Sequence, residues 1–282
     1  MEDCNMAELT QKQEQWAHEM KLKALEMALG TGANGSHIGG GFSAMEIYAV
    51  LYSGILNVNP ETKEDPLRDR IIASKGHAVL AQYTALWKAG WLTEEDLNTF
   101  DKNGTHFFGH PTRDLQYGLE NTAGSLSLGL SFGMGIALSC KKKELNNRII
   151  VVLGDGECDE GLVWEALMAA SHYQLNNLTI IVDKNGYQLD GPTEEIMNAA
   201  PLAQKFEAFG FQVNTVDGHN CEQLTEAISK RYDKPNVIIA NTIKANGISF
   251  LVNNKMSHMC PLTQKQYEQA LTELNSYHYG NQ

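Results

Sequence analysis

Residues 148–186 read RIIVVLGDGECDEGLVWEALMAASHYQLNNLTIIVDKNG and have the pattern of a strand, a helix and a second strand. The stretch starts with an unbroken apolar run, continues with an amphipathic segment of helical length, and ends with a second apolar run. Continuous apolar strands separated by a helix are typical of a parallel sheet whose two faces are covered by helices. We therefore expect strands at 148–154 and 178–184 and a helix at 160–173.

The alternation continues beyond this stretch. Helices are predicted at 201–210 and 221–232 and strands at 211–218 and 236–243. Toward the amino terminus the sequence predicts a helix at 9–29, a glycine-rich loop at 30–41, a helix that Ser43 caps, a short strand at 71–74, and near the other end a terminal helix after Leu262. The expected fold class is α/β, a parallel sheet flanked by helices on both faces, formed as a single domain by residues 1–282.

Composition excludes several classes of protein. The 282 residues carry a formal net charge of −12, which repels nucleic acid and anionic membranes. The polar start MEDCNMAELTQKQEQW lacks the apolar core of a secretion signal, and no later stretch has the roughly 18 apolar residues of a membrane span. Five scattered cysteines without a CxxC pair indicate reduced thiols. These features predict a cytoplasmic protein.

Polar residues follow two of the predicted strands at the edge where open α/β sheets bind ligands. Gly154-Asp155-Gly156-Glu157 follows the first strand, and Asn185-Gly186 follows the second. Glycines at a strand-to-helix turn admit a phosphate to backbone N–H groups. A carboxylate in the same turn repels a bare diphosphate, so Asp155 indicates a divalent cation between the two. Asn185 offers a neutral oxygen to that ion, a combination that suits Mg²⁺.

Other motifs that contain these residue types do not fit. An EF-hand loop started at Asp155 requires glycine and glutamate where Glu160 and Ala166 stand. The Gly-Lys-Ser/Thr of a phosphate-binding P-loop is missing, and the turn has too few glycines for a nicotinamide dinucleotide fingerprint. A zinc pair of His106 and His110 is unfavourable because Pro111 prevents the helix that this spacing needs.

GDGECDEGLVWEA followed by VDKNG resembles the thiamine diphosphate fingerprint, GDG followed about thirty residues later by Asn. The flanking segments NGSHIGGGFSAMEIYAVLY, DRIIASKGHAVLAQYTALWKAG, GTHFFGHPT, LENTAGSLSLGLSFGMGIAL and SHMCPL resemble blocks of the amino-terminal domain of transketolases. The likeness covers roughly residues 15 to 265 and implies thiamine diphosphate and Mg²⁺ as cofactors.

The resemblance assigns roles residue by residue. It implies that the side chains of Asp155 and Asn185 and the carbonyl of Tyr187 bind Mg²⁺. The residues implied to bind the cofactor are His77, Gly124, Ser125, Leu126, Gly154, Asp155, Gly156, Glu157 and Asn185. The implied catalytic residues, which face the reacting carbons and assist proton transfer, are His37, His110 and His258. Glu160 and Glu165 match acids at the interface between subunits.

Two segments depart from the family pattern. Ser36 and Ile38 stand where glycine and proline are usual around the histidine, and Ser127 and Leu128 stand where glycine and glutamine are usual. The backbone before His37 and the segment beside the aminopyrimidine are therefore the places where this chain is expected to differ from its family.

The glutamate that activates thiamine diphosphate in this superfamily lies in a second, pyrimidine-binding domain, and this chain ends before such a domain begins. The resemblance thus implies a separate carboxyl-terminal transketolase subunit that carries the pyrimidine-binding and carboxyl-terminal domains, an α2β2 assembly, and a sugar or sugar-phosphate substrate. Two alternatives stay open here: the α chain of a 2-oxo acid dehydrogenase, which also carries GDG and Asn, and a homologue that binds the cofactor without catalysis.

Overall fold

The computed structural model describes residues 6–252 and 254–276, and these form one five-stranded parallel sheet of order β1-β2-β3-β5-β4. The strands are β1 (Arg70–Ala73), β2 (Ile149–Gly154), β3 (Leu178–Lys184), β4 (Gln212–Asp217) and β5 (Asn236–Asn241). All four pairings are parallel. The strands predicted from residues 71, 148, 178, 211 and 236 onward are therefore confirmed to within a few residues.

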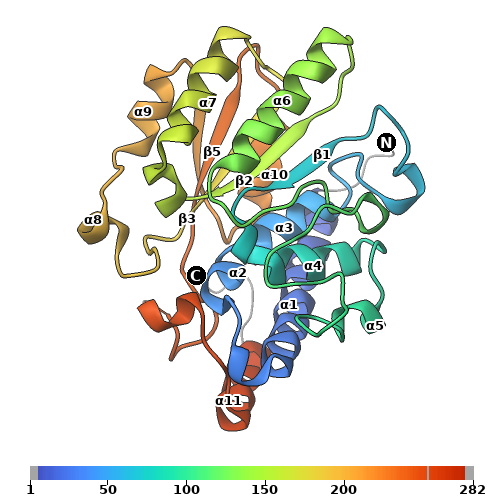
Figure 1. Ribbon diagram of the computed structural model, residues 1–282, viewed down its shortest axis with the longest axis vertical. Coiled ribbons are helices and arrows are strands. Elements are labelled where there is room, and N and C mark those ends of the chain that lie inside the picture. Colours follow the sequence, from blue (N-terminus) through green and yellow to red (C-terminus); the bar gives the residue numbers. More distant parts are fainter. Residues whose placement is uncertain (1–5, 253, 277–282) are drawn as a thin grey trace.

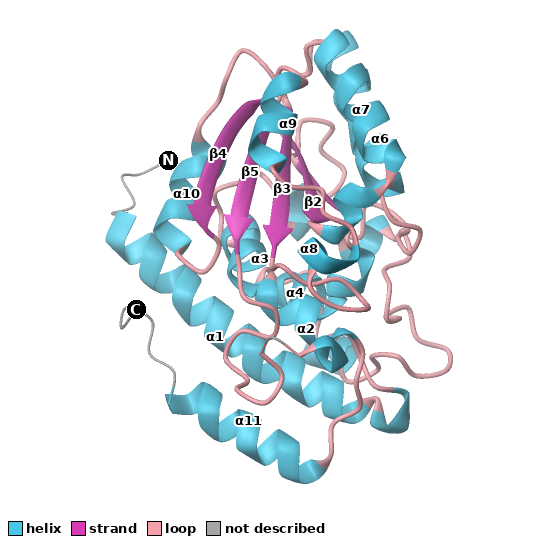
Figure 2. Ribbon diagram, turned by 90° about the vertical axis from the view of Figure 1, so that its left-hand side faces the viewer, coloured by secondary structure: helices cyan, strands magenta, loops and turns pink. Residues whose placement is uncertain are grey.

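Helices cover both faces of the sheet (Figures 1 and 2). They are α1 (Met6–Gly30), α2 (Ile38–Ser43), α3 (Met45–Tyr52), α4 (Val79–Lys88), α5 (Glu94–Leu97), α6 (Leu128–Lys142), α7 (Gly161–His172), α8 (Thr193–Ile196), α9 (Leu202–Ala208), α10 (Cys221–Ser229) and α11 (Gln264–Ser276). Short 3-10 turns lie at Gly32–Asn34, Pro60–Thr62, Gly76–Ala78, Leu115–Tyr117, Gly156–Asp159 and Lys255–His258. The expected α/β class is confirmed.

The apolar residues of each strand divide between two cores. In β2, Ile150 and Val152 pack with α1, α3 and α4, whereas Ile149, Val151 and Leu153 pack with α6, α7 and α9. Alternate side chains of a strand point to opposite faces, so an unbroken apolar run supplies both cores at once. This is why the apolar runs of β2 and β3 are not interrupted by alternating polar residues.

The glycine-rich segment 30–41 was expected to be a loop throughout, and this expectation is wrong from residue 38 onward. Residues 38–43 form α2, a buried helix, in which a Cβ at Gly39 would lie 2.6 Å from Ser257 Oγ and one at Gly40 would lie 2.9 Å from His77 Cδ2. Close packing of two neighbouring segments against the glycines thus outweighs the poor helix propensity of glycine.

Ser43 does not cap the following helix as predicted. It is the last residue of α2, α3 begins at Met45, and the Ser43 hydroxyl instead donates to Asp183 Oδ2 at 2.6 Å. The helix predicted from the start of the chain is confirmed as α1, and the terminal helix is confirmed as α11 up to Ser276, with the remainder outside the described residues.

None of the helices in the described residues is long and apolar enough to cross a membrane. The described cysteines Cys140, Cys158, Cys221 and Cys260 are free thiols, and Cys4 lies outside the described residues. The carboxyl ends of β2 and β3 lie side by side and point toward α2, so the turns that follow these strands meet the glycine-rich helix (Figure 2).

Candidate active site

A cavity of about 360 Å³ lies where the turns after β2 and β3 meet α2. The predicted site residues that line it are His37, His77, His110, His258, Gly124, Leu126, Gly154, Asp155, Gly156, Glu157, Asn185 and Tyr187. Ser125 is exposed and is not among the lining residues. The fold therefore gathers nearly all of the predicted residues from segments that are far apart in the sequence.

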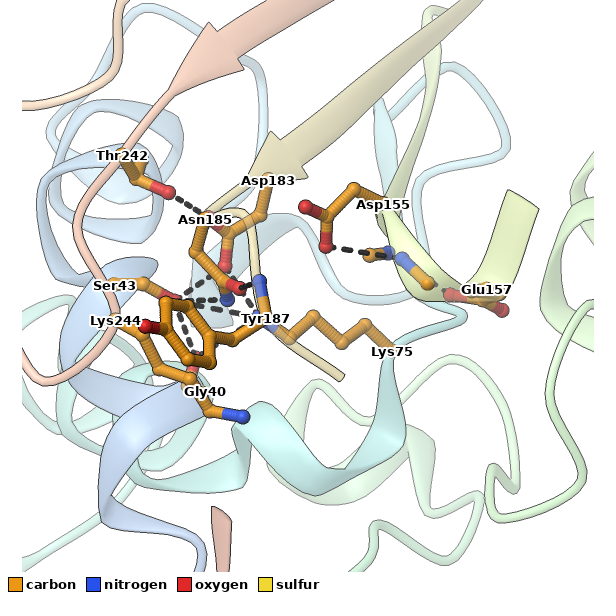
Figure 3. A network of polar contacts seen from close by, with 12 residues as sticks. Gly40, Ser43, Lys75, Asp155, Glu157, Asp183, Asn185, Tyr187, Thr242 and Lys244 are labelled. Carbon is orange, nitrogen blue, oxygen red and sulfur yellow. Dashed lines mark hydrogen bonds and ion pairs between the residues drawn. The ribbon is translucent and has the colours of Figure 1, made fainter. Parts of the chain in front are cut away.

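Asp155 and Asn185 extend from the ends of neighbouring strands (Figure 3). The Asp155 carboxylate accepts hydrogen bonds from the backbone N–H of Gly186 at 2.7 Å and of Gly156 at 3.0 Å. The Asn185 side-chain oxygen accepts from the N–H of Tyr187 at 3.0 Å, and its amide donates to Ser43 Oγ at 3.2 Å. These bonds hold both side chains at the cavity wall.

The donor set fits a hard divalent cation. Asp155 and Asn185 supply oxygen atoms that retain free lone pairs, and the described residues donate no hydrogen bond to the Tyr187 carbonyl. Burial raises the pKa of Asp155 to about 6, and the neighbouring Asp183 carboxylate contributes to this rise. Because the protein compensates so little of its negative charge, the Asp155 carboxylate is suited to binding a cation.

Glu157 is buried behind the turn and organises it. Its carboxylate accepts hydrogen bonds from Ser74 Oγ at 2.5 Å, from Ser127 N–H at 2.7 Å and from Gly154 N–H at 3.0 Å. Ser127, one of the residues that depart from the family pattern, has a φ of 69°, a left-handed conformation that glycine adopts without strain. The bond to Glu157 compensates for this strain and places Gly124 and Leu126 beside the cavity.

The backbone N–H groups of both glycines in the turn are engaged within it. Those of Gly154 and Gly156 donate to Glu157 and Asp155, whereas the sequence predicted that they approach a phosphate. Cationic side chains beside the turn therefore carry more of the attraction for a diphosphate than the glycine motif alone indicates.

Lys75 and Lys244 are cavity residues that the sequence motifs did not reveal. Both are nearly fully buried. Each follows the carboxyl end of a strand, β1 and β5, at the same edge as the GDG turn, and this position is the signal by which they could have been found. Burial and the neighbouring Lys75 lower the pKa of Lys244 to about 8.

A buried ion pair joins Lys75, which lines the cavity, to Asp183 (Figure 3). Lys75 Nζ also lies 3.2 Å from the carbonyl of Gly40, and the Asp183 carboxylate accepts further hydrogen bonds from Ser43 Oγ and Thr242 Oγ1. Because every charged atom of the pair has a partner, the network fixes β3, α2 and the turn after β1 in one arrangement.

The four predicted histidines converge on one another. The ring centroid of His37 lies 5.5 Å from that of His77, 5.2 Å from that of His110 and 5.3 Å from that of His258. Burial lowers the pKa of His37 and of His258 to about 4, and nearby histidine and lysine charges contribute. Burial also lowers the pKa of His77 and His110. Near neutral pH the rings are therefore uncharged and can both accept and donate hydrogen bonds.

Comparison with known proteins identifies the family. A sequence profile described as the transketolase thiamine diphosphate binding domain matches residues 14–278. The chain belongs to the transketolase family. The resemblance drawn from its motifs is thereby confirmed, and the family transfers ketol groups with thiamine diphosphate. The alternative assignment to the α chain of a 2-oxo acid dehydrogenase receives no support from this match.

Relatives of two lengths match the chain. It is 38% identical over 241 residues to the 6-deoxy-6-sulfo-D-fructose transketolase subunit SqwG of Clostridium sp. (strain MSTE9), covering 84% of this chain and 88% of that subunit. It is 35% identical over 246 residues to a subunit of the apulose-4-phosphate transketolase of Phocaeicola vulgatus, covering 86% and 87%. The solved transketolase from Leishmania mexicana superposes with a TM-score of 0.85 at 28% identity, covering 93% of this chain but 41% of that one.

Proposed function

We propose that this transketolase-family chain is the subunit that binds thiamine diphosphate and Mg²⁺ in a two-chain transketolase. In this proposal it transfers a two-carbon ketol group from a ketose or ketose phosphate to an aldose or aldose phosphate. The observation that carries the proposal is one cavity that is lined by oxygen ligands for a cation, by a lysine that suits a diphosphate and by a cluster of neutral histidines.

We assign the cation to Asp155, Asn185 and the carbonyl of Tyr187, and the cofactor diphosphate to the neighbouring Lys244 and His77. When bound, thiamine diphosphate would supply a nucleophilic carbon for the ketose carbonyl and would take up the electron pair that carbon–carbon cleavage leaves. Asp155 brings the negative charge that the cation neutralises, and Lys244 brings a positive charge to the same wall.

The histidines act on the sugar. As neutral rings with lowered pKa values, His37 and His258 can accept a proton from a substrate hydroxyl and return it, and His110 can hydrogen-bond the same end of the sugar. The rings of His110 and His258 lie 5.2 Å and 5.3 Å from that of His37, which leaves room for a hydroxyl between them. The arrangement orients the reacting carbons and moves protons at their oxygens.

A separately encoded partner subunit completes the enzyme in this proposal. Two relatives that the chain covers over 88% and 87% of their own length are named as transketolase subunits. The contacting helices α6 and α7 expose Leu128, Phe132 and Met168, which are 52%, 41% and 56% exposed. We propose that this apolar surface, together with Glu160 and Glu165 in the first turns of α7, docks the partner in an α2β2 assembly in the cytoplasm.

The test measures association and cofactor binding. The chain is mixed with the product of the neighbouring gene, the mass of the assembly is determined by light scattering, and thiamine diphosphate is titrated with Mg²⁺ or with a chelator. We expect a heterotetramer that binds the cofactor only with Mg²⁺, and Asp155→Ala abolishes that binding. Asp233→Ala, which changes an exposed carboxylate on the loop before β5, serves as the matched control and binds normally. Metal-dependent binding retained by Asp155→Ala contradicts the assignment of the metal.

A further inference from the structure

A second cavity, of about 540 Å³, adjoins the cofactor cavity and shares His37 and His110 with it. If the reacting carbons of a sugar lie at these two histidines, the rest of the sugar can therefore extend into this second cavity. Most of its wall is apolar or uncharged, formed by side chains such as Val79, Phe108 and Met259. Its chemistry is thus set by the few polar groups that remain.

Asp101 is the charged residue of this cavity. Among the described residues that line it, Asp101 alone carries a formal charge once His37 and His110 are neutral. Burial lowers the pKa of His110 in spite of the opposing effect of the Asp101 charge, which places that carboxylate within electrostatic reach of the ring. The cations nearest in sequence, Lys102 and Arg113, are exposed and do not line the cavity.

The backbone of Asp101 is fixed by a hydrogen bond, whereas the oxygens of its carboxylate have no partner among the described residues. The φ of Asp101 is 55°, and its N–H donates to the carbonyl of Phe107 at 2.8 Å. In residues 6–252 and 254–276 no hydrogen bond or ion pair engages the carboxylate, and its side chain remains half-buried. A fixed acceptor without a protein partner, in a cavity that continues a sugar site, is placed to meet a substrate.

We propose that Asp101 is a specificity-determining residue that selects sugars whose end in this cavity is uncharged and bears hydroxyl groups, and that disfavours phosphorylated or sulfonated ends there. This inference rests on the ketol transfer proposed above. Hydroxyl groups donate charge-assisted hydrogen bonds to a carboxylate, whereas a phosphate or sulfonate oxygen can only accept. In a largely apolar cavity the repulsion between the two anions is weakly screened. An anionic substrate end must then be recognised by groups outside this cavity.

The test compares acceptors with and without an anionic end. In the assembled enzyme, kcat/KM is measured for D-ribose and D-ribose 5-phosphate with one common ketose donor, and for the two-carbon acceptor glycolaldehyde, which lacks the sugar end proposed to enter this cavity. Asp101→Asn and Asp101→Gly remove the charge, and both residues tolerate a left-handed backbone. We expect both variants to raise the kcat/KM ratio of ribose 5-phosphate to ribose by at least about tenfold, with the glycolaldehyde value unchanged.

Asp114→Asn is the matched control, because Asp114 lies close to His110 in the sequence but outside the cavity, and its side-chain acceptor role toward Gln116 is one that asparagine retains. The control keeps the wild-type ratio. An unchanged ratio in the Asp101 variants, or an equal loss for all three acceptors, overturns the inference and leaves the proposed function standing. A wild-type assembly that transfers to none of the acceptors contradicts the proposed function instead.

Discussion

The carboxylate of Asp155 and the backbone N–H of Gly186 are joined by a 2.7 Å hydrogen bond that ties the turn after β2 to the turn after β3. The two residues follow adjacent parallel strands, so the bond forms at the edge where the carboxyl ends meet. It orients a carboxylate whose pKa burial raises to about 6. The hydrogen bond itself favours the ionised carboxylate, but burial and the Asp183 charge outweigh it, so Asp155 is partly protonated near pH 6 in the absence of a cation.

This gives the cofactor site a pH dependence. The folded-state pKa of Asp155 is raised from 3.8 to about 6, so between these values the folded chain binds a proton that the unfolded chain releases, and stability of the metal-free chain falls as pH rises through this window. Because Mg²⁺ binds the ionised carboxylate, its affinity weakens about tenfold per pH unit below about 6. Calorimetric titration of Mg²⁺ with thiamine diphosphate at about pH 5, 6 and 7.5 measures the effect. An affinity that stays constant over this range contradicts it.

We predict that the buried Lys75–Asp183 ion pair is required for the stability of the folded chain. Lys75→Ala leaves the Asp183 carboxylate buried without its cation, and we expect a loss of about 3–5 kcal/mol in the free energy of unfolding. Lys88→Ala breaks the ion pair of Lys88 with Glu19, which is partly exposed, and costs about 0–1 kcal/mol. Urea denaturation compares the two variants. Equal losses of unfolding free energy in the two variants would show that burial does not determine how much an ion pair contributes to stability.

The histidine cluster makes a prediction about catalysis. His37→Ala and His258→Ala are expected to lower kcat of the assembled enzyme by about 10²–10⁴-fold, the usual contribution of general acid–base groups, while cofactor binding changes little. His106→Ala, four residues before His110 and 65% exposed at its side chain, provides the control and retains activity. If either site variant turns over like this control, its ring takes no part in proton transfer.

The proposed docking surface can be tested without touching the cavity. Phe132→Asp and Met168→Asp introduce a charge on the apolar surface of α6 and α7 and are expected to weaken assembly with the partner by at least about tenfold, since an unpaired charge becomes buried in the interface. Met6→Asp changes a similarly exposed apolar residue at the start of α1, which packs against the other face of the sheet, and leaves assembly intact. Analytical ultracentrifugation distinguishes them. Self-association of the chain that Phe132→Asp abolishes shows that a second copy occupies the surface instead.

Much of the fold followed from periodicity. The unbroken apolar runs at 149–154 and 178–184 supply both cores of the sheet, and this demand made the strands predictable. The helix at Ile38–Ser43 was not predictable, because its glycines are required by the approach of His77 and Ser257 from distant segments. Ser43 likewise has the residue type of a cap, but its hydroxyl bonds Asp183, a partner 140 positions away.

The residues of the candidate site could be predicted where they belong to local sequence motifs. Asp155 and Asn185 follow neighbouring strands, and this order alone predicts that they lie close together. Lys75 and Lys244 were not predicted, because the SKGH segment was used only for His77 and Lys244 lies in no quoted segment, although both lysines follow strand ends at the same edge. Asp101 had no signal at all, since its position in the cavity that His37 also lines depends on the path of a loop that the sequence pattern does not determine.

The most direct measurement is ketol transfer from xylulose 5-phosphate to D-ribose and to ribose 5-phosphate with thiamine diphosphate and Mg²⁺, by the chain alone, by its partner alone and by the two together. We expect turnover only in the mixture, and its loss with Asp155→Ala. Turnover by the chain alone contradicts the division of the site between two subunits. A stable, cofactor-loaded heterotetramer that transfers a ketol group from no ketose to any aldose contradicts the proposed function.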